Sequence, residues 1–406
     1  MSISLIGKSI SESATLKLNE TFAILKAKGE PVIHLGGGEP KSKAPIEAIT
    51  TAASFLDGGE VRYTPSDGLR EMKQAVIRYT EEHYGRKVNP DNVIVSNGAK
   101  QAIMVALQAI LDPQDELLFP APYWVSYPEM AKLIGAIPVP VYPEDGSFYP
   151  TLKDIEQNIT SNTKAIIINS PNNPTGVQYS ENFVKEIVQF TEKKGIYLIM
   201  DDIYHRLLFD GKKPVVAYNY SKKSEENSKI IVINGVSKSY AMTGFRIGWA
   251  VANKKIVKVM TNIQSHQTAG PSALLQKAAM AAMNGIQSSV ENLKSTLENN
   301  RNVMLQQLKA FDGVHVVKPA GTFYVFVDFS NFEKDSRKLS AFLLDKVRVL
   351  AVPGIEFGLE GYLRISYCGS IKDIIEGIRR IKWAIDPNSP NELYIGERKL
   401  VRDWVS

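Results

Sequence analysis

Cysteine and histidine are scarce in this chain. A single cysteine, Cys368, stands among 406 residues, and the five histidines are scattered along the sequence. One cysteine cannot close an intramolecular disulfide, and scattered histidines do not provide the Cys/His clusters that zinc sites need. The sequence therefore excludes a disulfide framework, and we expect no metal site.

Long hydrophobic runs and blocks of like charge are also missing. No apolar stretch approaches the ~18 residues of a membrane span, and the first thirteen residues contain no signal-peptide core. The 48 basic and 43 acidic residues are mixed along the chain and give a net charge of +5. A nucleic-acid arm or a polybasic membrane patch would concentrate one sign. We expect a cytoplasmic protein that binds neither nucleic acid nor membrane.

The composition is that of an ordinary globular protein, with 44% hydrophobic and 22% charged residues. Between residues 93 and 250, short runs of β-branched residues alternate with helical periodicity, which predicts a parallel sheet with helices on both faces. The clearest predicted strands are Val93–Val95, Ala165–Ile168, Tyr197–Met200 and Ile230–Ile233. Residues 288–311 predict one long helix, and residues 314–383 predict a smaller unit of helices and strands.

Polar residues follow three of these strands. Asn173 comes after the second strand, Asp201 and Asp202 after the third and Lys238 after the fourth, and Arg246 follows eight residues later. Open α/β sheets bind ligands at the carboxyl ends of their strands. A lysine among small uncharged residues favours Schiff-base chemistry, and an arginine favours phosphate. A buried carboxylate needs a cationic partner, such as a protonated ring nitrogen.

The first strand is followed by Asn97-Gly98-Ala99-Lys100, where a helix is predicted to begin. Backbone N–H groups at such a turn can bind an anion or a phosphate. Each of these signals alone is weak, because turns, asparagines and surface lysines are common. Together they describe one ligand with a phosphate, a basic ring nitrogen and an aldehyde, and pyridoxal phosphate has all three.

The motifs resemble those of class I aminotransferases, in the pyridoxal-phosphate fold-type I family, and specifically the aspartate aminotransferase branch. The matching motifs are Tyr63-Thr64-Pro65 with Asp67-Gly68-Leu69, the segment 122–128 (PYWVSYP), the segment 170–176 (SPNNPTG), Ser237-Lys238 and the segment 242–248 (MTGFRIG). The resemblance implies an α/β fold whose large domain, residues 46–287, has a mainly parallel seven-stranded sheet flanked by helices. Residues 1–45 and 288–406 would form a smaller α+β domain.

The resemblance also implies catalytic roles. Lys238 would bond the cofactor and then move the substrate proton, Asp201 would keep the ring nitrogen protonated, and Tyr204 would contact the phenolic oxygen. The other implied cofactor contacts are Asn173, Trp124, Gly98, Ala99, Lys100, Ser237 and Arg246, together with Tyr63 from a neighbouring subunit. The implied substrate contacts are Arg364 and Gly38 at the α-carboxylate, with Trp124 and Asn173. A site shared between subunits implies a homodimer.

The implied reaction is transamination between an L-amino acid, aspartate or a related or aromatic one, and a 2-oxo acid, with 2-oxoglutarate the expected acceptor. One departure concerns dicarboxylic substrates, because relatives usually carry a basic residue where this chain has Ser11-Glu12. The other cation of those relatives, Lys100, is kept. Lys41 and Lys43 stand where relatives usually have acidic and aromatic residues.

Two other classes of enzyme share part of this sequence pattern. A pyridoxal-phosphate-dependent carbon–sulfur β-lyase or a cyclopropane-forming synthase uses the same residues, so this alternative stays open. A nicotinamide dehydrogenase would share the α/β pattern, but the chain lacks the G-x-G-x-x-G motif after a first strand that its pyrophosphate would need.

Overall fold

The computed structural model describes residues 3–396 and 398–404. Its largest sheet has seven strands in the order β2-β8-β7-β6-β5-β3-β4. The strands are β2 (Val93–Ser96), β3 (Glu116–Pro120), β4 (Ile137–Val141), β5 (Thr163–Asn169), β6 (Tyr197–Asp201), β7 (Ile230–Gly235) and β8 (Gly248–Val251). Strand β8 runs antiparallel to both of its neighbours, and the other pairs are parallel. The prediction of a mainly parallel seven-stranded sheet is therefore confirmed.

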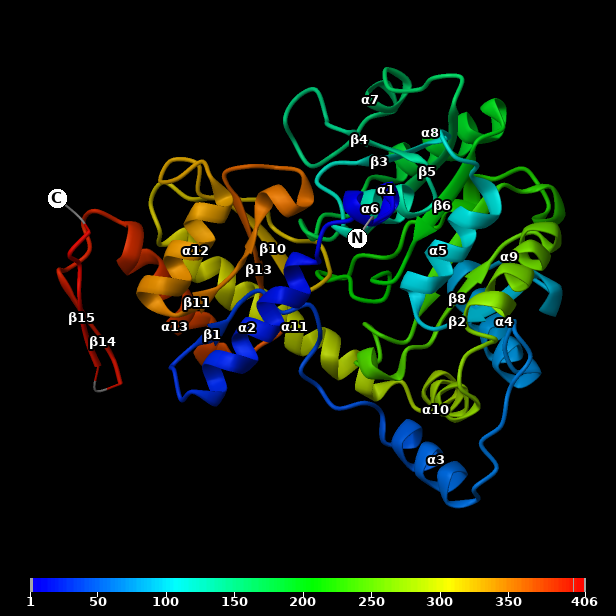
Figure 1. Cartoon of the computed structure of the whole chain (residues 1–406), viewed down its shortest axis with the longest axis horizontal. Helices are drawn as coiled ribbons and strands as arrows, with labels where there is room; N and C mark the ends of the chain where they lie inside the picture. Colours follow the sequence, from blue (N-terminus) through cyan, green and yellow to red (C-terminus); the bar gives the residue numbers. More distant parts are fainter. Residues whose placement is uncertain (1–2, 397, 405–406) are drawn as a thin grey trace.

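Both faces of this sheet are buried. Along β5, Ile166 and Ile168 enter one hydrophobic core, while Ala165 and Ile167 enter another on the opposite face. This alternation follows from the two-residue period of a strand and explains why each strand is almost continuously apolar. The helices around the sheet are α4 (Arg70–Tyr84), α5 (Ala99–Ile110), α6 (Ser126–Leu133), α7 (Leu152–Glu156), α8 (Glu181–Lys194), α9 (Lys254–Gln267) and α10 (Ala273–Asn284). Figure 1 shows them on both sides of the strands.

The second part of the molecule has its own core around a four-stranded antiparallel sheet, ordered β12-β13-β10-β9. Its elements are β9 (His315–Val316), β10 (Tyr324–Asp328), β12 (Val352–Pro353), β13 (Tyr362–Ser366), α12 (Ser336–Val347) and α13 (Ile371–Ile385). Strand β1 (Ile33–His34) pairs in parallel with β11 (Val349–Leu350), so the N-terminal region joins this part. The long helix predicted from residue 288 is present as α11 (Ser288–Lys309), and Figure 1 shows it crossing from the large sheet to the second part.

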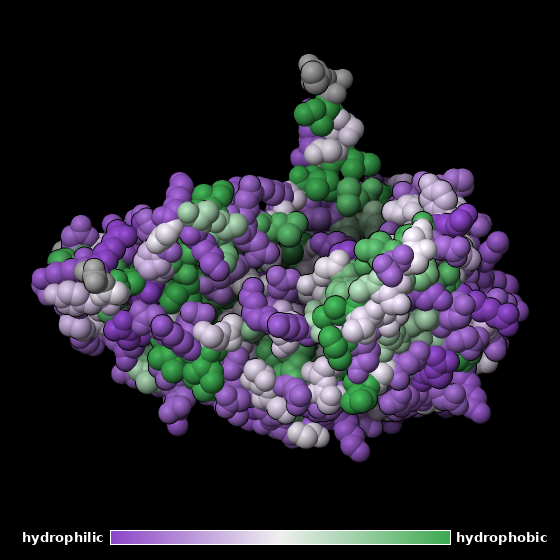
Figure 2. Space-filling model, turned by 90° about the horizontal axis from the view of Figure 1, so that it is seen from below, coloured by the Kyte–Doolittle hydropathy of each residue, from purple (hydrophilic) through white to green (hydrophobic). Residues whose placement is uncertain are grey.

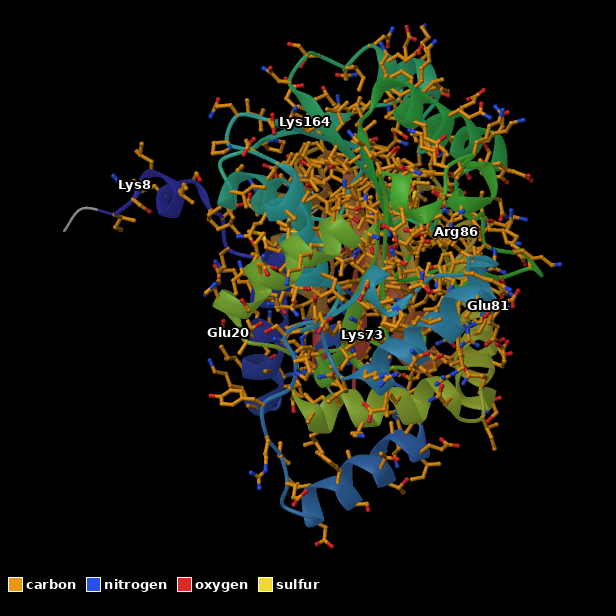
Figure 3. All side chains as sticks on the ribbon, turned by 90° about the vertical axis from the view of Figure 1, so that its right-hand side faces the viewer. Lys8, Glu20, Lys73, Glu81, Arg86 and Lys164 are labelled. Carbon is orange, nitrogen blue, oxygen red and sulfur yellow. The ribbon has the colours of Figure 1, made fainter. Side chains whose placement is uncertain are left out.

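The two ends of the chain lie outside the main sheets. The first helices are α1 (Leu5–Ser9), α2 (Ala14–Ala27) and α3 (Ile46–Asp57). Figures 2 and 3 show the N-terminal segment, marked by Lys8 in Figure 3, standing away from the body of the molecule. The C-terminal residues, whose role the sequence did not reveal, form a hairpin of β14 (Glu392–Ile395) and β15 (Arg398–Val401). Trp404, just after the hairpin, packs edge-on against Trp383 of α13, with ring centroids 5.5 Å apart.

Short 3₁₀ helices lie at Pro90–Asn92, Ala217–Tyr220, Glu225–Asn227, Thr243–Phe245 and Gly354–Phe357. Within residues 3–396 and 398–404, no helix has the length and apolar character needed to cross a membrane. The domain boundaries expected at residues 46 and 288 stay a prediction, although α11 does begin at the second of them.

Candidate active site

A cavity of about 410 Å³ opens beside the carboxyl ends of β5, β6 and β7. Its volume is within the range of small-molecule sites. The predicted site residues that line it are Gly38, Ala99, Lys100, Trp124, Asn173, Asp201, Tyr204, Ser237, Lys238, Arg246 and Arg364. The structure thus brings together residues separated by more than 300 positions in the chain, while their individual roles stay predictions.

Asn169 links the end of β5 to the end of β6 by a hydrogen bond and was not singled out from the sequence. Its amide nitrogen donates to the backbone oxygen of Asp201 at 2.8 Å, and its amide oxygen accepts from the backbone N–H of Asn173 at 2.8 Å. Both bonds are buried, where a polar group without a partner is costly. Asn169 therefore fixes the relative positions of Asn173 and Asp201.

Asp201 is buried at the end of β6 and has two different carboxylate oxygens. Oδ2 accepts a 2.6 Å hydrogen bond from the Tyr127 hydroxyl, while Oδ1 has no hydrogen-bond partner within the part of the chain that the structure describes. Burial raises the pKa of Asp201 to about 6, against the opposing effects of Tyr127, the Ile203 backbone and Lys238. The free oxygen marks a place for a cationic donor. The adjacent Asp202 is buried beside Tyr84, and burial raises its pKa to about 8.

Lys238 follows β7 and lies partly open to the cavity. Its Nζ donates to the backbone oxygen of Gly38 at 2.6 Å and lies 5.8 Å from the ring centre of Tyr204 and 5.6 Å from that of Phe323. Burial, with a smaller effect from the Arg364 charge, lowers the pKa of Lys238 to about 8. About a tenth of this amine is then neutral at pH 7, far more than for a solvated lysine.

The turn before α5 forms a cradle for an anion. Gly98 has φ +83°, and a Cβ atom built on it would lie 2.6 Å from Nη2 of Arg246. Only glycine permits this close approach of the guanidinium to the helix start. The N–H groups of Ala99 and Lys100 belong to the first turn of α5, which an α-helix leaves without internal partners. Ser237 adds a hydroxyl to the same cavity.

Arg364, on β13, is only 2% exposed. Nη1 donates to Asn173 Oδ1 and Nη2 to the Gly36 backbone oxygen, both at 3.0 Å, whereas Nε has no partner among the described residues. The aromatic rings of Tyr324 and Phe357 lie 4.2 and 5.0 Å from the guanidinium carbon. These partners are neutral, so they leave a buried positive charge that a carboxylate in the cavity would compensate.

The outer wall of the cavity comes from α2 and the segment that follows β1. Thr15, Leu16 and Asn19 of α2 line it together with Glu39, whose Oε2 accepts a 2.8 Å hydrogen bond from the Thr243 hydroxyl. None of these side chains was singled out from the sequence. Lys41 and Lys43, which were noted there, are not among the residues that line the cavity.

Other missed residues had different signals in the sequence. Tyr127 lies inside the motif PYWVSYP, so its motif was recognised but its contact with Asp201 was not. Tyr324 lies on β10, and its hydroxyl accepts from the Tyr204 hydroxyl at 3.3 Å. No local sequence pattern predicts this role of Tyr324, because its contact with Tyr204 forms only when the two parts of the chain pack together.

Tyr63, a predicted cofactor contact, does not line the cavity in this single chain. Its exposed fraction is 97%, and it is absent from the cavity lining. The resemblance implies that Tyr63 acts from a neighbouring subunit, and that role stays a prediction.

The donor set fits pyridoxal phosphate. Within residues 3–396 and 398–404, no group of three or more His, Cys, Asp or Glu residues could hold a metal ion. The unpartnered Oδ1 of Asp201 suits a protonated ring nitrogen, and the cradle at Gly98 suits a phosphate. Lys238, with a lowered pKa, suits an aldehyde. These three groups line or border the same cavity.

Comparisons with known proteins agree with this geometry. The family model described as aminotransferase class I and II matches residues 30–381. The aspartate aminotransferase of Streptomyces avermitilis is 38% identical over 388 residues, covering 92% of this chain and 94% of that protein. A probable aspartate/prephenate aminotransferase of Aquifex aeolicus is 37% identical, covering 92% and 96%. The solved aspartate aminotransferase of Thermus thermophilus with maleate superposes with a TM-score of 0.89 at 32% identity, covering 94% of this chain and 99% of that one.

Proposed function

The chain belongs to the aminotransferase class I and II family, and from this premise we propose that it moves the amino group of an L-amino acid, aspartate or a related or aromatic one, to 2-oxoglutarate. The observation that carries the proposal is that a lysine, an unpartnered carboxylate oxygen and a buried uncompensated arginine line one cavity. They provide an amine, a site for a ring nitrogen and a site for a substrate carboxylate.

The proposed cofactor is pyridoxal phosphate, held by Asp201, the α5 turn, Ser237 and Arg246. When bound, it supplies an aldehyde that bonds amino groups and a ring that withdraws electrons from the adjacent carbon. Asp201 keeps a proton on the ring nitrogen, because a carboxylate in a dry site favours a cation beside it. Tyr127 fixes the Asp201 carboxylate through the bond to Oδ2.

Lys238 acts as the base of the proposed reaction. Its lowered pKa keeps part of the amine neutral at pH 7, so Nζ can accept the proton from the substrate Cα. Arg364 binds the substrate α-carboxylate and orients the Cα–H bond toward that nitrogen. Asn173 holds the guanidinium in place through the 3.0 Å bond to Nη1. The same base returns the proton in the opposite direction when the 2-oxo acid is converted into an amino acid.

The substrate side chain would lie between α2 and Lys100. Nζ of Lys100 is 5.0 Å from the centre of the Trp124 ring, and burial together with Arg246 lowers the pKa of Lys100. Glu12, where relatives usually carry a cation, is exposed and pairs with Lys17 at 3.3 Å. One cation supports binding of a second carboxylate, while the uncharged α2 wall also leaves room for aromatic side chains. Relatives named for aspartate or for aspartate and prephenate support this range.

A homodimer with shared active sites is also part of the proposal. The exposed apolar residues Ile46, Ile49 and Leu56 lie on α3, and Val61 and Tyr63 follow in the same exposed segment. Figures 1 and 3 show α3 at the edge of the molecule, away from the central sheet. A second copy covering this face would bury the apolar residues and bring Tyr63 into the partner's cavity.

The assay that tests the proposed function incubates the purified protein and pyridoxal phosphate with 2-oxoglutarate and each of a panel of L-amino acids. The expected result is glutamate formation that is fastest with aspartate or with an aromatic amino acid. No glutamate from any member of the panel would refute the proposal. Tyr63→Phe tests the shared site: we expect weaker cofactor binding in a dimer of unchanged mass, measured by light scattering and cofactor titration.

A further inference from the structure

His34, at the end of β1, contacts two different segments through its two ring nitrogens. Nε2 lies 2.7 Å from Oδ1 of Asn19 on α2, and Nδ1 lies 3.2 Å from the backbone nitrogen of Gly36. The Gly36 N–H can only donate, so Nδ1 accepts, and the proton on Nε2 is donated to Asn19. The ring also packs on Phe22, with centroids 4.9 Å apart.

The two contacts lead to two different parts of the cavity. The backbone oxygen of Gly36 accepts a hydrogen bond from Nη2 of Arg364 at 3.0 Å. Leu35, the residue before Gly36, donates its N–H to the backbone oxygen of Leu350 and so continues the pairing of β1 with β11. Asn19 itself lines the cavity on the α2 side. His34 therefore contacts Asn19 directly and is linked to Arg364 through Gly36.

The charge state of His34 is suited to this contact. Burial, with smaller effects from Lys41 and Arg364, lowers the pKa of His34 to about 4, and Glu39 opposes the shift only weakly. At neutral pH the ring is neutral, so Nδ1 keeps the lone pair that the Gly36 N–H needs.

We propose that His34 is a positioning residue that couples the α2 wall to the carboxylate site at Arg364. By accepting from Gly36 it holds the backbone oxygen that orients Arg364, and by donating to Asn19 it holds α2 at a fixed distance from that site. A substrate that contacts both Arg364 and α2 then binds two groups held at a fixed distance from each other. This inference rests on the proposed function, because it assigns Arg364 to a substrate carboxylate.

Three variants separate the two bonds from simple packing. His34→Phe keeps a ring against Phe22 and removes both bonds. His34→Asn places an amide oxygen near the position of Nδ1, and His34→Gln places an amide N–H near the position of Nε2. His315→Asn, at an exposed histidine on β9, is the matched control.

The test titrates each holoenzyme with maleate, an unreactive dicarboxylate, followed by the absorbance of bound cofactor, and measures kcat and KM for amino donors. We expect His34→Phe to raise the maleate Kd and the donor KM about tenfold, as for the loss of two hydrogen bonds, one partly buried and one exposed. Its kcat and cofactor spectrum should stay within about twofold. His34→Asn should recover part of the loss, and His315→Asn should match the unaltered protein.

An unchanged maleate Kd in His34→Phe would overturn the proposal. If that variant fails to fold or to bind the cofactor, Asn19→Ala decides instead, because Asn19 is exposed on α2. A raised Kd in Asn19→Ala that His34→Asn does not raise further in the double variant supports the coupling, and an unchanged Kd or fully additive effects overturn it. If the unaltered protein binds maleate but transfers no amino group, the proposed function fails, while the maleate titrations still test His34.

Discussion

The floor of the cavity and its outer wall are built from different kinds of residue. The floor consists of Asn173, Asp201 and Lys238 at the ends of three neighbouring strands. Asn173 and Asp201 are buried, and the pKa values of Asp201 and Lys238 are displaced. The α2 part of the wall consists of side chains such as Thr15, which is partly exposed, and Asn19, which is exposed, and both are uncharged. Groups whose pKa values are displaced toward neutral pH are suited to proton transfer, while the uncharged α2 side chains are suited to contacts with the substrate side chain. We therefore expect floor variants to change the rate and wall variants to change the substrate.

The largest expected effect is that of Lys238→Ala on the floor. Because this change removes both the amine that bonds the cofactor and the base for the Cα proton, kcat/KM should fall by at least about 10⁴-fold. The measurement is the initial rate of glutamate formation over a range of amino-donor concentrations, which gives kcat/KM. Lys164→Ala, at an exposed lysine of β5, is the control and should keep full activity. Activity within tenfold of the unaltered protein would contradict the assignment of Lys238.

Asp201→Asn should give the next largest loss. Losing one partner of a buried charge pair costs about 3–5 kcal/mol, so kcat should fall by roughly 10² to 10⁴-fold. Asn fills nearly the same space and can still accept from Tyr127, so the fold should be kept. The measurement is the steady-state rate with cofactor in excess. If excess cofactor restored the kcat of the unaltered protein, Asp201 would contribute only to cofactor affinity.

The same variant should change the pH dependence of stability in the cofactor-free protein. The folded-state pKa of Asp201 is raised to about 6 from an ordinary value of 3.8, so its burial destabilises the fold increasingly as pH rises from about 4 to 6. Asp201→Asn removes this penalty and should be more stable than the unaltered protein by up to about 3 kcal/mol at pH 8. Urea unfolding should show the difference shrinking toward pH 4, and a difference independent of pH would contradict the raised pKa.

Arg364→Lys should have an intermediate effect that falls mainly on substrate binding. A lysine keeps the charge but loses the planar pair of donors that orients a carboxylate, and it cannot keep both bonds to Asn173 and Gly36. We expect the donor KM to rise about 100-fold, or about 2.7 kcal/mol. Equal activity toward an amine that has no α-carboxylate would confirm the role, whereas an equal loss with that amine would show a general defect.

The smallest effect is expected for Lys100→Ala, on α5 at the side of the cavity that faces the α2 wall. Its ammonium is the cation available to a second carboxylate, and a single partly exposed contact is worth about 1 kcal/mol. The KM for aspartate should rise about fivefold, while the KM for an aromatic donor should change by less than twofold. Kinetics with the two donors side by side give the ratio. An equal loss with both donors would show that Lys100 acts on the reaction itself and does not select the second carboxylate.

The floor was predictable from sequence because each of its residues follows a strand within a few positions. Asn173, Asp201 and Lys238 each end a run whose apolar pattern fixes the strand, so their meeting at one edge follows from the topology of a parallel sheet. The choice of Asp201 over Asp202 came from the resemblance, and the two-residue period explains why only Asp201 reaches the cavity.

The wall was not predictable in the same way. Asn19 and Tyr324 reach the cavity only because α2 and β10 pack beside the large sheet, and no spacing in the chain records such a contact. His34 was not singled out from the sequence, because its link to Asn19 exists only when α2 packs beside β1. The C-terminal hairpin is fixed by contacts such as Trp404 on Trp383, which likewise have no local signal.

The central claim, amino-group transfer rather than elimination, is tested most directly by the stoichiometry of a half-reaction. Purified holoenzyme is mixed with aspartate, or with the best donor of the panel, and no 2-oxo acid is added. We expect one equivalent of the corresponding 2-oxo acid per active site, no free ammonia, and renewed turnover when 2-oxoglutarate is added. Continuous release of a 2-oxo acid and ammonia from a single amino acid would contradict the account and indicate a lyase.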